Sequence, residues 1–539
     1  MRKLMIIIVI ALGSSFVQAQ KLQRPKLVVG VVIDQMRWDY LYRYFDRFGN
    51  DGFKKIMKEG FNCENTYIPY TPTVTAMGHA CVFTGSVPAF HGIMGNNWYD
   101  ELQKKIVYCT EDNSVEGVGS SSAAGKMSPR NMWSNTIADE LRLATNFRNK
   151  TIAIALKDRG SILPGGHSSN GSYWFDNATG GWITSSYYMN ELPAWVKRFN
   201  DKKLPDQYIK KGWNTLYPLS TYKQSTADSN IYESRMPGED ISFPHRTDTI
   251  TRNRYDAFKT SPFGNTYTIE MAKAAIEAEQ LGARNETDFL AVSFSSPDYI
   301  GHTFTPNSIE VEDNYLRLDI DLANFLKYLD TRLGKGNYLL FITADHGVAH
   351  NPYFLNDHKL PGGVLDHNAV RRQMADTLHK RYGVPGIVAQ TINYQLYLND
   401  SIILKAGLDR NEIKSFLKDY LIKHPAISHI IDPSIANSLL PGRLRMMVAN
   451  GFNQKLSGDL QFIVKPQWYE RWQTGASHSH WNPYDSRIPL LWYGWNIPAG
   501  KTSREVYMTD IAATLANLLH IQVPNASVGH VIEEITDRK

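Results

Sequence analysis

The stretch LVVGVVID at residues 27–34 decides the fold, because seven apolar or small residues in a row end in an aspartate. A continuous apolar run of this length is typical of a strand buried on both faces of a sheet. Three similar runs occur at residues 151–156, 289–294 and 338–342. Helical patterns at residues 266–281 and 309–333 lie between some of the runs. Strands that alternate with helices predict an α/β fold with a central, mostly parallel sheet and helices on both faces.

Charged side chains follow all four predicted strands. They are Asp34 after the first, Lys157, Asp158 and Arg159 after the second, Asp298 after the third, and Asp345 and His346 after the fourth. In open α/β sheets the ligand crevice lies beyond the carboxyl ends of the strands, so one crevice would receive all of these groups. A single strand-end aspartate is usually a turn or helix cap. Three of them with nearby histidines are hard to explain in that way.

The spacing of carboxylates and histidines at these strand ends indicates metal binding. Asp298 and His302 are four residues apart and would share one face of a helix, and Asp345 and His346 are adjacent. Carboxylate and imidazole without thiolate suit zinc, and less well manganese or iron. Structural salt bridges are the simpler interpretation of each pair alone, whereas the pairs taken jointly favour metal. The segment GASHSHW at residues 475–481 adds two further candidate ligands, His478 and His480.

Thr75 is the candidate nucleophile. It lies in PTVTAMGH at residues 72–79, just before a helix-like run, where a helix N-terminus could begin. One interpretation is a helix N-cap, which threonine fills well. The other is a hydroxyl ionised by a metal, with the helix dipole favouring the alkoxide and an incoming phosphate. Composition does not distinguish the two.

The first 19 residues have the pattern of a secretory signal peptide. Arg2 and Lys3 precede an apolar run at residues 4–12, and VQA at residues 17–19 forms a small-residue cleavage site. The run is too short to span a bilayer comfortably. We therefore expect cleavage near Ala19 and Gln20, a mature chain at residues 20–539, and a periplasmic or secreted protein with no membrane contact once the signal is removed.

Composition and charge exclude several other classes of protein. The chain has 539 residues, 42% of them hydrophobic, and a net charge of +5 from 58 basic and 53 acidic side chains. That charge is too small for its length to indicate a nucleic-acid partner or an anionic membrane surface. The three cysteines, Cys63, Cys81 and Cys109, are an odd number, so at most one pair, such as Cys63 with Cys109, could form.

Seven motifs, in their order along the chain, resemble the alkaline phosphatase superfamily. The likeness is greatest to the PafA-type single-chain bacterial alkaline phosphatases, which are related to nucleotide pyrophosphatase/phosphodiesterases. The motifs are TAMGH (75–79), TG (84–85), HGI (91–93), GNN (95–97), KDRG (157–160), ADHG (344–347) and HSHWNPYD (478–485). The pair Asp298 and His302 also resembles a metal segment of the family. Asn96 follows Thr75 by 21 residues, as in the family. The resemblance covers nearly the whole mature chain and implies an alkaline-phosphatase-like fold.

The resemblance implies two zinc ions and a set of catalytic residues. One zinc ion would be held by Asp298, His302 and His478, and the other by Asp34, Asp345, His346 and the Thr75 oxygen. Thr75 would be the nucleophile, and Asn96, Lys157 and Arg159 would bind the phosphoryl group. The family's usual glycine after the last histidine ligand is Ser479 here, so His480 stays open as the alternative to His478.

The implied reaction is hydrolysis of phosphate monoesters through a phospho-threonine, with release of phosphate. Lys157 and Arg159 favour a dianionic monoester, because a diester monoanion needs less cationic neutralisation. The alternatives are a phosphodiesterase or nucleotide pyrophosphatase on the same two-zinc core, and a secreted binding protein without catalysis. By analogy with the family, insertions near residues 195–265 and 356–470 would cap the crevice. We expect small-molecule substrates and a monomer.

Overall fold

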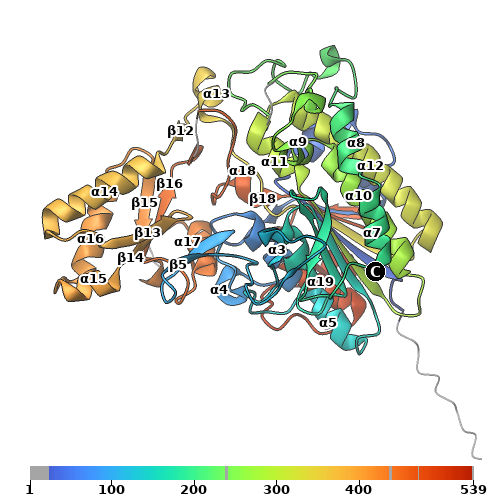
Figure 1. Ribbon diagram of the computed structural model, residues 1–539, viewed down its shortest axis with the longest axis horizontal. Coiled ribbons are helices and arrows are strands. Elements are labelled where there is room, and N and C mark those ends of the chain that lie inside the picture. Colours follow the sequence, from blue (N-terminus) through green and yellow to red (C-terminus); the bar gives the residue numbers. More distant parts are fainter. Residues whose placement is uncertain (1–22, 237–240, 436–439, 471–472, 537–539) are drawn as a thin grey trace, which may run out of the picture.

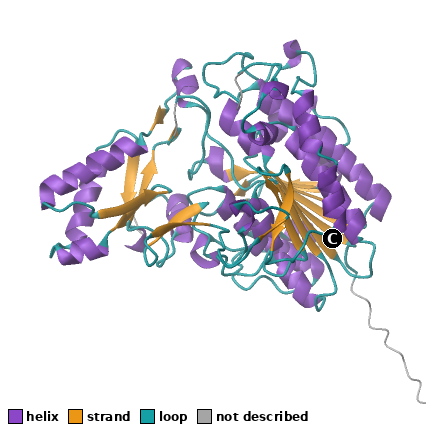
Figure 2. Ribbon diagram, in the orientation of Figure 1, coloured by secondary structure: helices purple, strands orange, loops and turns teal. Residues whose placement is uncertain are grey.

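The computed structural model describes residues 23–236, 241–435, 440–470 and 473–536. It has a larger lobe, crossed by a ten-stranded sheet, and a smaller lobe with a sheet of its own (Figures 1 and 2). The predicted signal peptide lies outside the described residues. From edge to edge the large sheet contains β20 (Gly500–Thr502), β2 (Phe61–Cys63), β19 (Leu490–Gly494), β11 (Tyr338–Thr343), β1 (Leu27–Ile33), β10 (Asp288–Phe294), β7 (Thr151–Ala155), β8 (Gly171–Asp176), β9 (Gly181–Ser185) and β6 (Gly117–Val118).

The four strands predicted from apolar runs are parallel neighbours at the centre of this sheet. β1 pairs with β10 on one side and with β11 on the other, so that Leu27 lies between Asp288 and Tyr338. β10 also pairs in parallel with β7. All residues of β1 are buried, as its continuous apolar sequence predicts. Among the described strands of this sheet only β19 and β9 run against the others, so the predicted mostly parallel α/β fold is confirmed.

Helices cover both faces of the sheet (Figure 1). α3 (Thr75–Thr84), α6 (Asp158–Gly165) and α19 (Asp510–Leu519) pack together on one face. α10 (Phe263–Glu279) and α12 (Ile309–Leu333) cover the other. The bounds of α12 are those that the sequence predicts, whereas α10 begins three residues before its predicted start.

The smaller lobe lies at the left of Figures 1 and 2 and has its own hydrophobic core. Its sheet contains, in spatial order, β13 (Val388–Ile392), β14 (Gln395–Leu398), β16 (Leu460–Val464) and β15 (Ile427–Ile431). α14 (His367–Tyr382), α15 (Asp400–Lys405) and α16 (Arg410–Leu421) belong to the same lobe. These elements fall inside the insertion predicted at residues 356–470. Their proposed action as a cap on the crevice stays a prediction.

The insertion predicted at residues 195–265 adds to the larger lobe instead of forming a lobe of its own. α7 (Ala194–Asp201), α8 (Leu204–Lys211) and α9 (Arg254–Lys259) all contact α10. This segment therefore extends the helical layer on the α10–α12 face of the sheet.

All three cysteines are buried and free, so the pairing that the odd count left open is not formed. Burial raises the pKa of the Cys109 thiol to about 12, which keeps it protonated and unreactive. Among the described residues, no helix combines the length and apolarity needed to cross a bilayer.

Candidate metal centre

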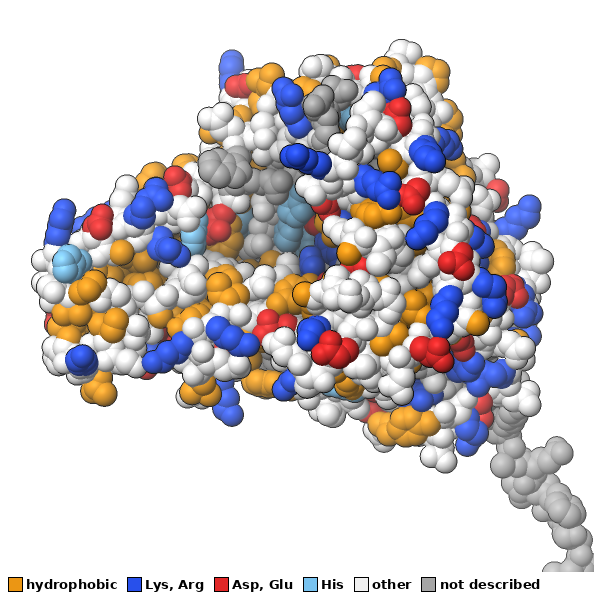
Figure 3. Space-filling view, in the orientation of Figure 1, with side chains coloured by type: hydrophobic (Ala, Val, Ile, Leu, Met, Phe, Trp, Pro, Cys, Tyr) orange, Lys and Arg blue, Asp and Glu red, His pale blue; other side chains and the backbone are white. Residues whose placement is uncertain are grey.

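The residues that follow the four central strands meet at one edge of the sheet. Asp34 follows β1 directly, and its neighbour Gln35 donates a backbone hydrogen bond of 3.0 Å to Oδ1 of Asp345, which follows β11. Asp298 lies on α11 (Ser296–Phe304), the helix that begins just after β10. Histidine side chains are visible in the hollow between the two lobes (Figure 3). The side chains that were predicted to meet beyond the strand ends therefore lie together.

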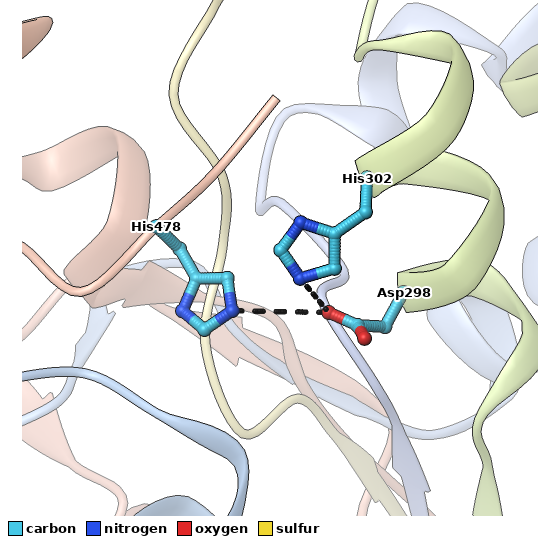
Figure 4. A group of neighbouring side chains, drawn as sticks. All are labelled: Asp298, His302 and His478. Carbon is cyan, nitrogen blue, oxygen red and sulfur yellow. Dashed lines mark ion pairs between the residues drawn. The ribbon is translucent and has the colours of Figure 1, made fainter. Parts of the chain in front are cut away.

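The first cluster consists of Asp298, His302 and His478 (Figure 4), whose potential ligand atoms lie within 4.8 Å of one another. Nε2 of His302 is 3.2 Å from Oδ1 of Asp298, and Nε2 of His478 is 3.9 Å from the same oxygen. In each ring the hydrogen bond made by the second nitrogen, Nδ1, fixes the tautomer. Nδ1 of His302 donates to the carbonyl of Ala476 at 2.8 Å, and Nδ1 of His478 donates to that of Thr73 at 2.7 Å. Both Nε2 lone pairs therefore face the Asp298 carboxylate, which suits a metal ion.

The second cluster consists of Asp34, Asp345 and His346, also within 4.8 Å and fully buried. Nδ1 of His346 donates to the carbonyl of Gly347, which turns Nε2 toward Oδ1 of Asp34 at 3.6 Å and Oδ2 of Asp345 at 3.5 Å. These two carboxylate oxygens have no hydrogen-bond partner within the described part of the chain. Buried unpaired carboxylate oxygens are costly, so their presence beside an imidazole lone pair fits a bound cation.

The electrostatics of the two clusters also suit cations. Burial, followed by the negative charges of Asp298 and Asp345, raises the pKa of Asp34 well above its usual value. Burial lowers the pKa of His346, and burial together with the neighbouring imidazoles lowers that of His478. The rings of His346 and His478 stack with centroids 3.6 Å apart, so two positive charges there would repel. Neutral imidazole is the form that binds metals.

Lys157 joins the two clusters. Its ammonium lies 2.6 Å from Oδ2 of Asp34 and 2.6 Å from Oδ2 of Asp298. Burial lowers the pKa of this lysine, but the charges of Asp298 and Asp34 outweigh burial and raise it above the usual value. The carboxylates of the two clusters therefore stabilise a positive charge that lies between them.

Thr75 is the first residue of α3 and lies beside the second cluster, with Oγ1 3.4 Å from Nε2 of His346. The extended residue Val74 is the N-cap and its side chain makes no capping hydrogen bond, so the interpretation of Thr75 as the N-cap is wrong. Oδ1 of Asn96 accepts a hydrogen bond of 3.0 Å from the backbone N–H of Ala76. This bond holds the Asn96 side chain at the N-terminal, positive end of α3.

A family model for type I phosphodiesterase / nucleotide pyrophosphatase matches residues 28–481. The chain belongs to this family. Alkaline phosphatase PhoV of Synechococcus elongatus is 50% identical over 518 residues, 96% of this chain and 94% of the relative. Alkaline phosphatase PafA of Elizabethkingia meningoseptica is 46% identical over 536 residues, 97% of each. A protein of Myroides odoratus named calcium-transporting ATPase is 49% identical over 527 residues, 96% of each.

Solved structures give the same result. A crystal structure of PafA has a TM-score of 0.94 and 45% identity, covering 96% of this chain and 100% of the other. A second PafA structure, with a TM-score of 0.93, carries substitutions at a threonine, an asparagine, a lysine and an arginine. Murine ectonucleotide pyrophosphatase/phosphodiesterase 5 has a TM-score of 0.53 at 14% identity, which shows a shared fold. The predicted membership of the alkaline phosphatase superfamily is confirmed.

In this member of the family, sequence reasoning missed the residues that hold the predicted site in place. His79 donates through Nδ1 to the Thr75 carbonyl at 2.9 Å, and that same nitrogen lies 3.3 Å from Oδ2 of Asp345. Gln35 donates through Nε2 to Oδ1 of Asp298 at 2.7 Å. The signal for His79 was its position one helical turn after Thr75. The sequence contained no signal for Gln35 other than its position next to Asp34.

Sequence reasoning also missed a tyrosine, Tyr108, that holds Arg159 through a hydrogen bond. The Tyr108 hydroxyl accepts a hydrogen bond of 3.1 Å from Nη1 of Arg159 and donates one of 2.7 Å to Oδ1 of Asp158. The Thr110 hydroxyl donates to the other oxygen of Asp158. Tyr108 thus joins the neighbouring residues Asp158 and Arg159 and limits how far the guanidinium can swing.

Of the two candidate histidines near the C-terminus, His478 lies in the first cluster and His480 lies apart. The His480 ring packs against Tyr394, with centroids 5.3 Å apart, and burial lowers its pKa to about 3. Between them Ser479 has φ = 99°, a value that favours glycine. The glycine usual in the family would adopt this backbone without strain. Ser479 nevertheless adopts this backbone, and His478 lies in the cluster.

Proposed function

We propose that the chain is an exported alkaline phosphatase that holds two zinc ions and hydrolyses small phosphate monoesters through a phospho-threonine. The observation that carries the proposal is the position of the Thr75 hydroxyl at the start of α3, beside two carboxylate–imidazole clusters that Lys157 joins. Two named alkaline phosphatases among the relatives support hydrolysis of phosphate monoesters and imply a metal cofactor.

Zinc, when bound, would lower the pKa of the attacking oxygen and stabilise charge on the leaving oxygen. The first ion would have Asp298, His302 and His478 as ligands, and the second Asp34, Asp345, His346 and the Thr75 oxygen. Thr75 would attack phosphorus in line and carry the phosphoryl group until water releases it. Its place at a helix N-terminus favours both the alkoxide and the incoming anion.

Three side chains would bind the non-bridging oxygens of the phosphoryl group. Asn96 uses its Oδ1 to accept from Ala76, which leaves its amide N–H groups to donate to the substrate. Lys157 and Arg159 would supply two positive charges, and the arginine can bind two oxygens at once. In the substituted PafA, the altered threonine and asparagine have the same separation as Thr75 and Asn96, and the altered lysine and arginine the same as Lys157 and Arg159.

The main alternative is a phosphodiesterase or nucleotide pyrophosphatase on the same core, as the name of the matching family suggests. A diester carries one negative charge on its phosphoryl group and replaces one charged oxygen with a second ester group. Two cations beside the phosphoryl group therefore favour the dianionic monoester. Export, the monomeric state and the capping role of the two insertions remain part of this proposal.

Steady-state kinetics on an aryl phosphate monoester and a matched diester test the substrate class. Arg159→Ala should lower kcat/KM for the monoester by about 100-fold, from loss of a charged hydrogen-bond donor, and for the diester far less. Arg504→Ala, which breaks a surface ion pair with Glu534, is the matched control and should change neither value. If the wild type prefers the diester and Arg159→Ala changes kcat/KM for neither substrate, the diesterase alternative is right.

Metal analysis tests the centre independently of substrate. The wild type should hold about two zinc equivalents, and Asp34→Asn and His302→Ala should each hold about one. Thr75→Ala should retain the metal but lose the phospho-enzyme seen when the wild type is quenched in acid with labelled substrate. Full zinc content in both ligand variants would overturn the ligand assignment.

A further inference from the structure

The tip of the β13–β14 hairpin joins the smaller lobe to the larger lobe close to a predicted substrate-binding residue. The two strands are connected by a two-residue turn, Asn393 and Tyr394. This turn meets a second hairpin, formed by β4 (Asn97–Asp100) and β5 (Lys105–Tyr108), which lies beside the smaller lobe in Figure 1. Asn96, which is predicted to bind the phosphoryl group, immediately precedes β4.

The Asn393 side chain contacts both neighbours of Asn96. Its Nδ2 donates a hydrogen bond of 2.6 Å to the Asn97 carbonyl. The same amide lies close to Gly95, where a Cβ would be 2.4 Å from Nδ2. A larger residue at this position would push the amide away, so the glycine permits the close approach. One side chain of the smaller lobe therefore lies against both residues that flank Asn96.

The pairing of β4 with β5 explains why the Asn97 carbonyl needs a partner outside its own hairpin. Asn97 lies opposite Tyr108. The next hydrogen bond runs from Cys109 N–H to the Asn96 carbonyl at 3.0 Å. Asn97 and Tyr108 are therefore a non-hydrogen-bonded pair, whose own N–H and C=O groups point away from the partner strand. Since the Asn393 amide donates to the Asn97 carbonyl, the smaller lobe holds the outer edge of β4.

The backbone of the turn also indicates a role beyond chain reversal. Asn393 has φ = 54° and Tyr394 has φ = 59°, and a type I′ turn requires positive values at both positions. Asparagine is common at the first position, whereas the second is usually glycine, and a left-handed backbone is strained for tyrosine. The Tyr394 ring packs 5.3 Å from that of His480, and its hydroxyl accepts from Glu470 N–H at 3.2 Å. The strained turn thus also contacts the loop that carries His478, and strain of this kind is typical of functional positions.

We infer that Asn393 is a positioning residue, through which the smaller lobe holds Asn96 at the phosphoryl group. The Asn96 side chain is held by the Ala76 N–H, and its backbone is held by its own hairpin and, through Asn97, by the smaller lobe. Loss of the Asn393 amide would remove one of these three contacts and let the Asn96 amide move relative to Thr75. The inference rests on the proposed function, in which Asn96 donates to a non-bridging oxygen.

A double-mutant cycle between positions 96 and 393 of the full chain tests the inference. Asn393→Gly removes the amide and keeps a residue that accepts positive φ. It should lower kcat/KM for an aryl phosphate monoester by about five- to ten-fold, the effect of one hydrogen bond, with unchanged zinc content. In the Asn96→Ala background the same change should lower kcat/KM by less than about two-fold, because Asn393 acts through Asn96.

Asn453→Asp is the matched control for a second variant, Asn393→Asp. Nδ2 of Asn453 also joins the 356–470 insertion to the larger lobe, by a bond of 2.9 Å to the Ala89 carbonyl in α4 (Pro88–His91), which carries no predicted site residue. Each aspartate replaces a donor with an acceptor. Asn393→Asp should lower kcat/KM at least as much as Asn393→Gly, whereas Asn453→Asp should stay within about two-fold of the wild type. The aspartate variant can enter the same cycle if Asn393→Gly does not fold.

Two outcomes would overturn the inference while the proposed function stands. The first is an equal loss of kcat/KM from Asn393→Gly in the wild-type and Asn96→Ala backgrounds, which is the result of a purely structural role. The second is wild-type kinetics in both Asn393 variants. Wild-type kcat/KM in Asn96→Ala would refute the proposed role of Asn96 and the inference with it. A wild type that prefers the diester would contradict the proposed substrate class alone, and the cycle is then measured on the diester with the same criterion.

Discussion

At the scale of the residue, the candidate site depends on side chains that contact the predicted metal ligands and substrate-binding residues without being predicted site residues themselves. Gln35, His79 and Tyr108 each fix one predicted site residue through hydrogen bonds of about the same length as those in secondary structure. Such partners set the orientation and the tautomer of a functional group, so their removal should alter catalysis more than stability.

Tyr108 allows this to be tested on Arg159. Tyr108→Phe removes the hydroxyl that joins Nη1 of Arg159 to Asp158 and keeps the ring. We expect kcat/KM for a phosphate monoester to fall about ten-fold, the effect of one hydrogen bond of about 1.4 kcal/mol, with a smaller fall for the diester. Tyr328→Phe loses a similar bond, to Glu277 far from the crevice, and should leave both values unchanged. An equal loss on both substrates would show that Tyr108 does not act through Arg159.

The ligands could be predicted from the sequence because their chemistry and their strand-end positions are both visible there. Asp34, Asp298 and Asp345 end apolar runs, and parallel strands bring such ends together. The supporting residues could not be predicted, since Tyr108 reaches Arg159 from a hairpin about 50 residues earlier and nothing local marks that contact. The choice between His478 and His480 was also out of reach, because a loop has no periodicity to decide which of the two faces inward.

At the scale of the element, α3 lies so close to the strand end after β11 that one glycine sets the distance. A Cβ on Gly78 would lie 2.5 Å from the Asp345 carbonyl oxygen and 2.8 Å from its Cα, both parts of the backbone. α3 carries Thr75, and Asp345 is a predicted ligand, so this contact fixes how near the hydroxyl comes to the second cluster. The sequence showed the helix and the strand but not their separation.

Gly78→Ala should therefore move α3 away from Asp345. We expect a stability loss of about 1–3 kcal/mol from overpacking, measured by urea unfolding, and a fall in kcat of at least ten-fold with weaker zinc retention. Gly442 is the first residue of helix α17 (Gly442–Gly451), and a Cβ built on it would meet no other atom. Gly442→Ala is therefore the control and should be neutral or slightly stabilising. Unchanged kcat in Gly78→Ala would mean that α3 tolerates the shift and that its distance from Asp345 is not critical.

The short helix α1 (Tyr40–Arg43) contributes a pH-dependent stability. Although burial opposes it, the charges of Arg37 and Arg43 hold the pKa of Asp39 at about 2, below its usual value. A carboxylate with a lowered pKa stabilises the fold above its unfolded pKa of about 4, and this contribution disappears as pH falls through about 2. Asp39→Asn should thus cost about 1–2 kcal/mol at pH 7 and progressively less below pH 4.

Urea unfolding of the metal-free protein between pH 7 and pH 3 measures this effect without a contribution from metal loss. Asp201→Asn, an exposed change at the end of α7, is the control and should give the same difference from wild type at every pH. A cost for Asp39→Asn that does not change between pH 7 and pH 3 would contradict the lowered pKa.

At the scale of the whole molecule, the two lobes have separate hydrophobic cores and should respond separately to damage. Leu396 in β14 and Leu340 in β11 are both buried, each in the core of its own lobe. Leu396→Ala should destabilise the smaller lobe by about 2–5 kcal/mol. Hydrogen exchange should then accelerate in β13–β16 and stay unchanged in β1 and β10. Leu340→Ala should do the reverse and release metal, because β11 leads directly to Asp345.

Equal acceleration of hydrogen exchange in both sheets after Leu396→Ala would show that the lobes unfold as one unit. The contacts of Asn393 and Tyr394 to the larger lobe would then be strong enough to couple the two lobes.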